Sequence, residues 1–142
     1  MKSYKIGYTQ GTYDLFHIGH LNLINNAKKQ CDYLIVGVNS DDLVLNYKGK
    51  ETNIKENDRA SIVSAIKGVD KVIITNTLDK TSIWKELGFN AIFIGDDWKG
   101  NARWKNTEIE LSKYGVDVIY LPHTEGISTT IINKKIKENK IQ

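Results

Sequence analysis

The chain has 142 residues and a net charge of +3, from 20 Lys and Arg against 17 Asp and Glu. Its length predicts one domain over residues 1–142, and its 40% hydrophobic and 26% charged residues are typical of a soluble globular protein. A single cysteine, Cys31, excludes an internal disulfide and a cysteine-only metal site. No apolar run approaches the ~18 residues of a membrane helix, and no secretory signal follows the N-terminus. We therefore expect a cytoplasmic protein, with neither a nucleic acid nor a membrane as partner, because the positive charge is weak.

Short apolar runs alternate with amphipathic stretches along the whole chain. In chain order, the pattern predicts a strand at 4–9, a helix at 18–30, a strand at 33–38, mostly loop at 40–57, a helix at 58–66, a strand at 71–75, a helix at 81–87, a strand at 91–94, a helix at 104–113, a strand at 116–121 and a helix at 129–139. This alternation predicts the α/β class, with a single doubly wound parallel sheet.

Glycine, hydroxyl and charged residues gather after the predicted strands. They occupy segments 10–20, 39–41, 95–100 and 122–130. Ligands of doubly wound sheets bind outside the carboxyl ends of the strands, where the strand order reverses. These segments are therefore the predicted site.

Two of the three histidines, His17 and His20, stand three residues apart at the start of the helix predicted over 18–30. That spacing puts both rings on one face, Gly19 lets a ligand approach the backbone, and the first turn offers unpaired N–H groups. The arrangement predicts a phosphate-binding site at the start of this helix. The alternative for each histidine taken alone is an ordinary surface or core residue. A metal site is disfavoured because no third ligand follows nearby, and the P-loop and G-x-G-x-x-G motifs are missing.

Three blocks carry a family resemblance. Gly11-Thr12-Tyr13-Asp14-Leu15-Phe16-His17-Ile18-Gly19-His20 resembles the cytidylyltransferase signature G-T-[FY]-D-x-x-H-x-G-H, and Gly126-Ile127-Ser128-Thr129-Thr130 resembles a second signature, R-T-E-G-I-S-T-[TS]. Gly95-Asp96-Asp97-Trp98-Lys99-Gly100 is similar to a block of the glycerol-3-phosphate cytidylyltransferases. Class I aminoacyl-tRNA synthetases share the H-I-G-H letters, but they are several times longer. The match in length favours the small glycerol-3-phosphate enzymes and their Rossmann-like nucleotidyltransferase fold.

The resemblance implies transfer of a cytidylyl group from CTP to glycerol 3-phosphate, giving CDP-glycerol and pyrophosphate by direct in-line attack. The residues implied as catalytic are His17, His20, Lys50 and Arg59. The residues implied as nucleotide-binding are Gly11, Thr12, Tyr13, His17, Gly19, His20, Lys50, Asp97, His123, Thr124, Glu125, Gly126, Ile127, Ser128, Thr129 and Thr130. Lys48 and Lys80 are implied to bind the acceptor. No protein metal site is expected, Mg²⁺ being brought by the CTP phosphates.

Plainer interpretations stay open for several of these residues. On these interpretations the lysines are solvated side chains, and Ser128 to Thr130 form a helix N-cap. Asp97 is then a loop residue, and Asp14 supports the first loop. His123 stands where the family has arginine, so its charge depends on pH. The resemblance also implies a homodimer and a role in teichoic-acid or capsule synthesis. The alternatives are another acceptor such as ethanolamine phosphate or a polyol phosphate, an ATP-dependent adenylyltransferase, and a non-catalytic nucleotide-binding regulator.

Overall fold

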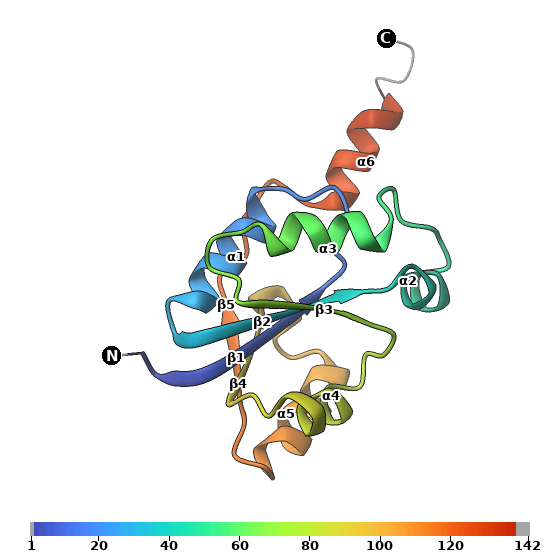
Figure 1. Cartoon of the computed structure of the whole chain (residues 1–142). Coiled ribbons are helices and arrows are strands. Elements are labelled where there is room, and N and C mark those ends of the chain that lie inside the picture. The colour runs from blue at the N-terminus through green and yellow to red at the C-terminus, as the bar shows by residue number, and fades with distance from the viewer. Residues whose placement is uncertain (1, 139–142) are drawn as a thin grey trace.

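The computed structural model describes residues 2–138 as one sheet between two layers of helices (Figure 1). The strands are β1 (Tyr4–Gly11), β2 (Cys31–Asn39), β3 (Lys71–Thr75), β4 (Ala91–Gly95) and β5 (Asp117–Leu121). The helices are α1 (Ile18–Lys28), α2 (Asp41–Lys48), α3 (Glu56–Ser64), α4 (Lys80–Leu87), the short 3₁₀ helix η1 (Asp96–Trp98), α5 (Ala102–Ser112) and α6 (Thr129–Glu138).

All paired strands are parallel, in the order β3-β2-β1-β4-β5. The chain moves outward from β1 to β3, then crosses back to β4, so the order reverses between β1 and β4. Right-handed crossovers place α1 and α3 on one face and α4 and α5 on the other, as Figure 1 shows. The predicted doubly wound sheet is therefore confirmed, and its reversal opens a crevice at the carboxyl ends of β1 and β4.

Each face of the sheet has its own apolar core. Ile24 of α1 and Val63 of α3 pack on one face. Ile83 of α4 and Leu111 of α5 pack on the other. Burial on both faces explains why the central strands read as near-continuous apolar runs in the sequence.

The loop predicted over 40–57 is wrong, since α2 occupies its first half. Ser40 begins this helix because its side chain accepts a hydrogen bond from the backbone N–H of Leu43, at 3.1 Å. Gly49 ends it in the left-handed conformation, with φ 71°. Only Leu43 and Val44 are buried, so the apolar pattern of this helix was too short to recognise.

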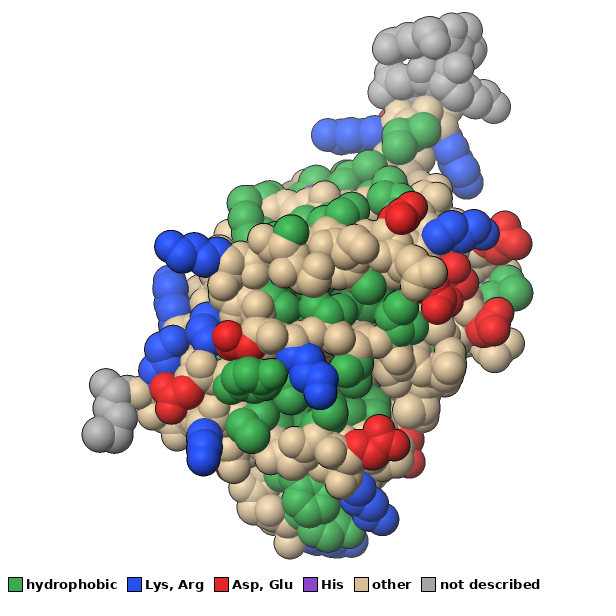
Figure 2. All heavy atoms as spheres, in the orientation of Figure 1, with side chains coloured by type: hydrophobic (Ala, Val, Ile, Leu, Met, Phe, Trp, Pro, Cys, Tyr) green, Lys and Arg blue, Asp and Glu red, His purple; other side chains and the backbone are tan. Residues whose placement is uncertain are grey.

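The other predicted elements are confirmed, with ends that differ by a few residues. The first helix ends at Lys28 rather than residue 30, and α3 begins at Glu56 rather than residue 58. Asn139, the predicted end of the last helix, lies outside the described residues. Helix α6 extends away from the body of the domain in Figure 1. The face seen in Figure 2 mixes basic, acidic and hydrophobic side chains.

Candidate active site

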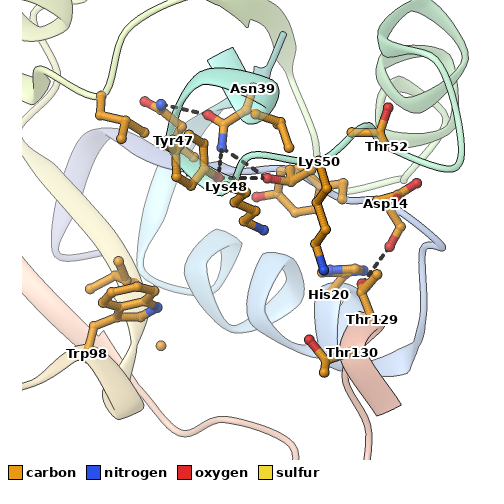
Figure 3. A pocket seen from close by; sticks show the side chains of 18 of the residues that line it. Asp14, His20, Asn39, Tyr47, Lys48, Lys50, Thr52, Trp98, Thr129 and Thr130 are labelled. Atoms are coloured by element: carbon orange, nitrogen blue, oxygen red, sulfur yellow. Dashed lines mark hydrogen bonds between the residues drawn. The ribbon is translucent and has the colours of Figure 1, made fainter. Parts of the chain in front are cut away.

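A cavity of about 530 Å³ opens at the carboxyl ends of the central strands. The predicted site residues that line it are Gly11, Thr12, Tyr13, His20, Lys48, Lys50, Lys80, Thr129 and Thr130. Figure 3 shows Trp98 on one side of this cavity and His20, Thr129 and Thr130 on the other. The cavity is thus built by loops that follow β1, β2, β3 and β4, together with the start of α6.

His17 and His20 form a reciprocal cap at the start of α1. The backbone N–H of Gly19 donates to Nδ1 of His17, at 3.0 Å, and the backbone N–H of His17 donates to Nδ1 of His20, at 3.2 Å. The two rings stack with their centroids 3.8 Å apart. A Cβ on Gly19 would lie 2.9 Å from Cε1 of His17, so glycine is required for this contact.

Both histidines are neutral near pH 7 in this arrangement. Burial lowers the pKa of His17, and burial with the nearby charges of His17 and Lys48 lowers the pKa of His20 to about 4, although Asp14 opposes the shift. Each Nδ1 accepts a hydrogen bond, so the hydrogen-bond network assigns the proton to Nε2. Each ring therefore keeps one Nε2–H donor that is not engaged by the cap.

The loop between β1 and α1 holds two non-glycine residues in the left-handed region, Tyr13 with φ 58° and Leu15 with φ 51°. Such backbone persists only where its surroundings determine it. Asp14 supplies that constraint, because its carboxylate accepts from the backbone N–H groups of Asn53 and Ile54, at 2.8 and 2.9 Å. The supporting role predicted for Asp14 is confirmed, and it ties the first loop to the segment before α3.

Arg59 is fully buried and does not line the cavity. Its guanidinium donates to the backbone carbonyls of Ile54 at 2.8 Å, Thr12 at 2.7 Å and Asn39 at 2.7 Å, and to the carboxylate of Asp41 at 2.6 Å. Arg59 thus joins the ends of β1 and β2 to α3. The structure places this predicted catalytic residue behind the site, where it positions the loops.

Lys48 and Lys50 flank Gly49 at the end of α2, and both side chains reach the cavity (Figure 3). Lys80 enters from the start of α4 and is only 7% exposed. Its ammonium donates to the carbonyl of Leu78, at 2.8 Å, and lies 5.3 Å from the ring centroid of Trp104. Burial, with a smaller contribution from Arg103, lowers the pKa of Lys80 to about 8, while Asp79 opposes the shift.

The start of α6 completes the cavity. The hydroxyl of Ser128 accepts from the backbone N–H of Ile131, at 3.1 Å, as an N-cap does. The hydroxyl of Thr129 donates to the carbonyl of Asp14, at 2.6 Å, which joins α6 to the first loop. The first turn of α6 therefore presents its N–H groups beside the histidine pair.

Several predicted nucleotide-binding residues border the site without lining the cavity. They are His17, Gly19, Asp97, His123, Thr124, Glu125, Gly126, Ile127 and Ser128. The 123–128 segment lies along α1, since Asn22 donates to the hydroxyl of Thr124 at 2.9 Å and a Cβ on Gly19 would lie 3.6 Å from Cγ2 of Ile127.

His123 is paired with Asp96 across the ends of β4 and β5. Its Nδ1 lies 2.5 Å from Oδ1 of Asp96, and both side chains are exposed. The hydrogen bond and charge of Asp96 raise the pKa of His123, and the hydrogen bond of His123 lowers the pKa of Asp96. Asp96, Asp97 and His123 also form the one group of three possible metal ligands among residues 2–138, with ligand atoms within 4.8 Å of one another.

Sequence reasoning missed several residues that line the cavity. They are Tyr47, Thr52, Arg103 and Trp104. Asn39, within the predicted segment 39–41, also lines the cavity, although no role was assigned to it. Tyr47 and Thr52 fall in the segment wrongly predicted as loop, and Arg103 and Trp104 in a stretch without any recognisable motif.

A doubly wound parallel sheet with a cavity where its strand order reverses is the architecture of many nucleotide-binding α/β proteins. A family model described as cytidylyltransferase-like matches residues 8–135. The chain therefore belongs to the cytidylyltransferase-like family, as its motifs predicted.

Curated relatives agree with that assignment. The chain is 41% identical to a glycerol-3-phosphate cytidylyltransferase of Bacillus spizizenii, over 89% of this chain and 92% of the relative. It is 34% identical to the protein of that name from Staphylococcus aureus, over 90% and 92%. It is also 32% identical to the bifunctional protein HldE of Helicobacter hepaticus, over 99% of this chain but 28% of that protein.

Solved structures agree on the fold. A lipopolysaccharide core biosynthesis protein from Thermoplasma volcanium is 26% identical, with a TM-score of 0.70 over 85% of this chain and 97% of that one. Within residues 2–138, none of the helices has the length and apolar character needed to cross a membrane.

Proposed function

We propose that this chain is a CTP-dependent cytidylyltransferase that acts on glycerol 3-phosphate and releases pyrophosphate. The observation that carries the proposal is the neutral His17–His20 pair at the start of α1, of which His20 lines the cavity together with Lys48 and Lys50 while His17 borders it. The relatives named glycerol-3-phosphate cytidylyltransferase, aligned over most of the chain, support the choice of acceptor.

The proposed step needs positioning and charge neutralisation rather than a strong base. A phosphate monoester has a second pKa of about 6, so the acceptor oxygen is largely ionised near neutrality. This oxygen attacks the α-phosphorus of CTP in line, a new P–O bond forms, and the bond to the β-phosphate oxygen breaks with pyrophosphate as leaving group. His17 and His20 donate to the α-phosphate oxygens, where charge accumulates.

The remaining cations and hydroxyls divide between the two substrates. Lys50, with the N–H groups of Thr129 and Thr130 and the hydroxyl of Thr130, binds the nucleotide phosphates. Lys48 and Lys80 face the acceptor. A helix N-terminus suits the β- and γ-phosphates because its N–H groups are unpaired and its dipole is positive.

The cytidine would lie beside Asp97 and the segment from His123 to Ser128. A carboxylate accepts hydrogen bonds from the amino group of cytosine. Adenine at the same position would present its amino group in a different place. In this proposal Arg59 acts through the backbone it positions, without touching substrate.

Mg²⁺ would enter with the triphosphate. The carboxylate of Asp14 fits poorly as a ligand because its oxygens already accept N–H groups of Asn53 and Ile54. The phosphates then supply the oxygen ligands that Mg²⁺ prefers, and the ion would neutralise part of their charge.

We also propose that the chain forms a homodimer and that its product feeds bacterial teichoic-acid or capsule synthesis. Support for a dimer comes from β3, an edge strand of the sheet whose Ile74 is exposed. Light scattering coupled to size exclusion tests it, and a monomer at micromolar concentration contradicts it.

The test of the function is pyrophosphate release with Mg²⁺, from CTP or ATP, against glycerol 3-phosphate, ethanolamine phosphate and choline phosphate. We expect turnover with CTP and glycerol 3-phosphate. Turnover only with ATP would replace the proposal by an adenylyltransferase. CTP binding without turnover of any pair would favour a regulator.

A further inference from the structure

One end of the cavity, at the starts of α4 and α5 and the end of η1, is formed by Lys80, Trp98, Arg103 and Trp104. We call these four residues the acceptor wall. Two tryptophans beside a pocket suggest a cage for a quaternary ammonium, which binds over aromatic faces. The arrangement of the wall's own cations argues against that use.

Each of the two tryptophan rings already has a cation of the protein over one of its faces. The ammonium of Lys80 lies 5.3 Å from the ring centroid of Trp104, and the guanidinium carbon of Arg103 lies 5.5 Å from that of Trp98. A ligand with a positive head would have to displace these groups or approach them with like charge. Either cost disfavours choline- or ethanolamine-type acceptors.

Hydrogen-bond acceptors are also scarce at the wall. Only 7% of Lys80 is exposed, yet among the described residues the carbonyl of Leu78 is its single hydrogen-bond partner. An ammonium has three donors, so Lys80 has donors to spare. The indole N–H of Trp104, itself buried, has no acceptor among the described residues.

The acidic groups near the wall do not cancel its charge. The charge of Asp79 opposes the lowered pKa of Lys80, and its Oδ1 accepts from the backbone N–H groups of Thr81 and Ser82 at the start of α4. Lys80 and Arg103 thus outnumber it, and the wall has a net positive charge with unused donors.

We propose that the acceptor wall selects the alcohol phosphate by its head group, accepting a head with hydroxyl oxygens and rejecting one with an ammonium, and that Arg103 is a specificity-determining residue for this choice. The inference rests on the proposed transfer to an alcohol phosphate, which it deepens. It assigns a role to a residue that no motif of the sequence marks.

The sharpest test compares two acceptors that differ in one group. In 2-hydroxyethyl phosphate a hydroxyl stands where ethanolamine phosphate has an ammonium, and the two are nearly equal in size. We expect the protein to prefer 2-hydroxyethyl phosphate by about tenfold or more in kcat/KM, the effect of roughly one unfavourable charge contact.

The variant Arg103→Glu then probes the wall. We expect it to reduce that preference by about tenfold, mainly through the KM of the acceptor, with the KM of CTP unchanged. The matched control is Lys105→Glu, which makes the same charge change on the exposed side of α5, outside the cavity lining. Equal use of both acceptors by the unmodified protein overturns the inference, and so does an Arg103→Glu effect no larger than that of the control.

A binding measurement separates this inference from the proposed function. If no acceptor is turned over with CTP, the proposed function fails, and calorimetry of the same two phosphates still reports the selectivity. Tighter binding of 2-hydroxyethyl phosphate that is lost in Arg103→Glu would support the wall. Equal binding of both phosphates would refute it.

Discussion

The buried guanidinium of Arg59 allows a quantitative test of how the site is held together. Replacing it by methionine, Arg59→Met, keeps much of the apolar stem but removes all four hydrogen bonds. Three carbonyl oxygens and the carboxylate of Asp41 lose their donor. Each lost bond costs on the order of 1 kcal/mol, and a broken buried ion pair costs about 3–5 kcal/mol. The three carbonyl bonds account for about 3 kcal/mol, and because Asp41 is partly exposed its pair with Arg59 adds at most about 1 kcal/mol, so we expect a total loss of about 3–4 kcal/mol in the free energy of unfolding.

Urea unfolding followed by circular dichroism measures that loss. The control is Lys67→Met, which removes the same charge from an exposed position and should change stability by no more than about 0.5 kcal/mol. Arg59→Lys keeps the charge but cannot make the four contacts, so we expect it to lose about half as much or more. A loss below about 1 kcal/mol for Arg59→Met would refute the assignment of Arg59 as the joint between the loops.

The pH dependence of the Arg59–Asp41 pair gives a second readout of the same contact. Burial alone would raise the pKa of Asp41, but hydrogen bonds from Arg59, Thr52 and the backbone of Glu56 lower it overall. A depressed folded-state pKa stabilises the fold above the ordinary value of 3.8, and that stability is lost as pH falls through the folded pKa. In Arg59→Met the loss of stability at acid pH should therefore be smaller than in the unmodified protein.

Three further predictions concern the nucleotide side of the site. His20 should titrate near pH 4 by NMR in the free protein and at higher pH with CTP bound, and a titration midpoint above pH 6 in the free protein would contradict the neutral cap. His20→Ala should lower kcat by about 10²–10³. The KM of CTP should rise about twofold to fivefold as pH increases from 6.5 through the raised pKa of His123, because the charged pair with Asp96 is lost. His123→Arg should make the KM of CTP independent of pH. A KM that does not change with pH in the unmodified protein would exclude a role of charged His123 in CTP binding. Gly19→Ala should raise the KM of CTP about tenfold in steady-state kinetics, because its Cβ would displace the ring of His17. An unchanged KM of CTP would show that the cap is not needed for CTP binding.

Local sequence patterns specified the elements of this fold. Apolar runs of strand length and the helix stops at Gly88 and Gly115 gave the order of strands and helices, because these signals act over a few residues. Helix α2 was not predicted because only Leu43 and Val44 are buried in it, too few to produce a helical period in the sequence. The strand-end rule and the motif around His17 and His20 were sufficient to locate the site from the sequence.

The roles of individual residues depended on contacts that the sequence does not encode locally. Arg59, Lys80 and Arg103 are all basic residues near helix starts in the sequence. Arg59 is buried behind the loops, Lys80 is buried within the cavity, and Arg103 is exposed at the edge of the cavity.

The sequence by itself determined the family, the sheet and the place of the site, since each follows from short-range pattern and from motifs at fixed spacing. Only the tertiary structure decided which charges meet a ligand and which hold the backbone. Those roles depend on burial and on partners distant in the chain, such as Thr12 and Arg59, which are 47 residues apart and 2.7 Å from one another.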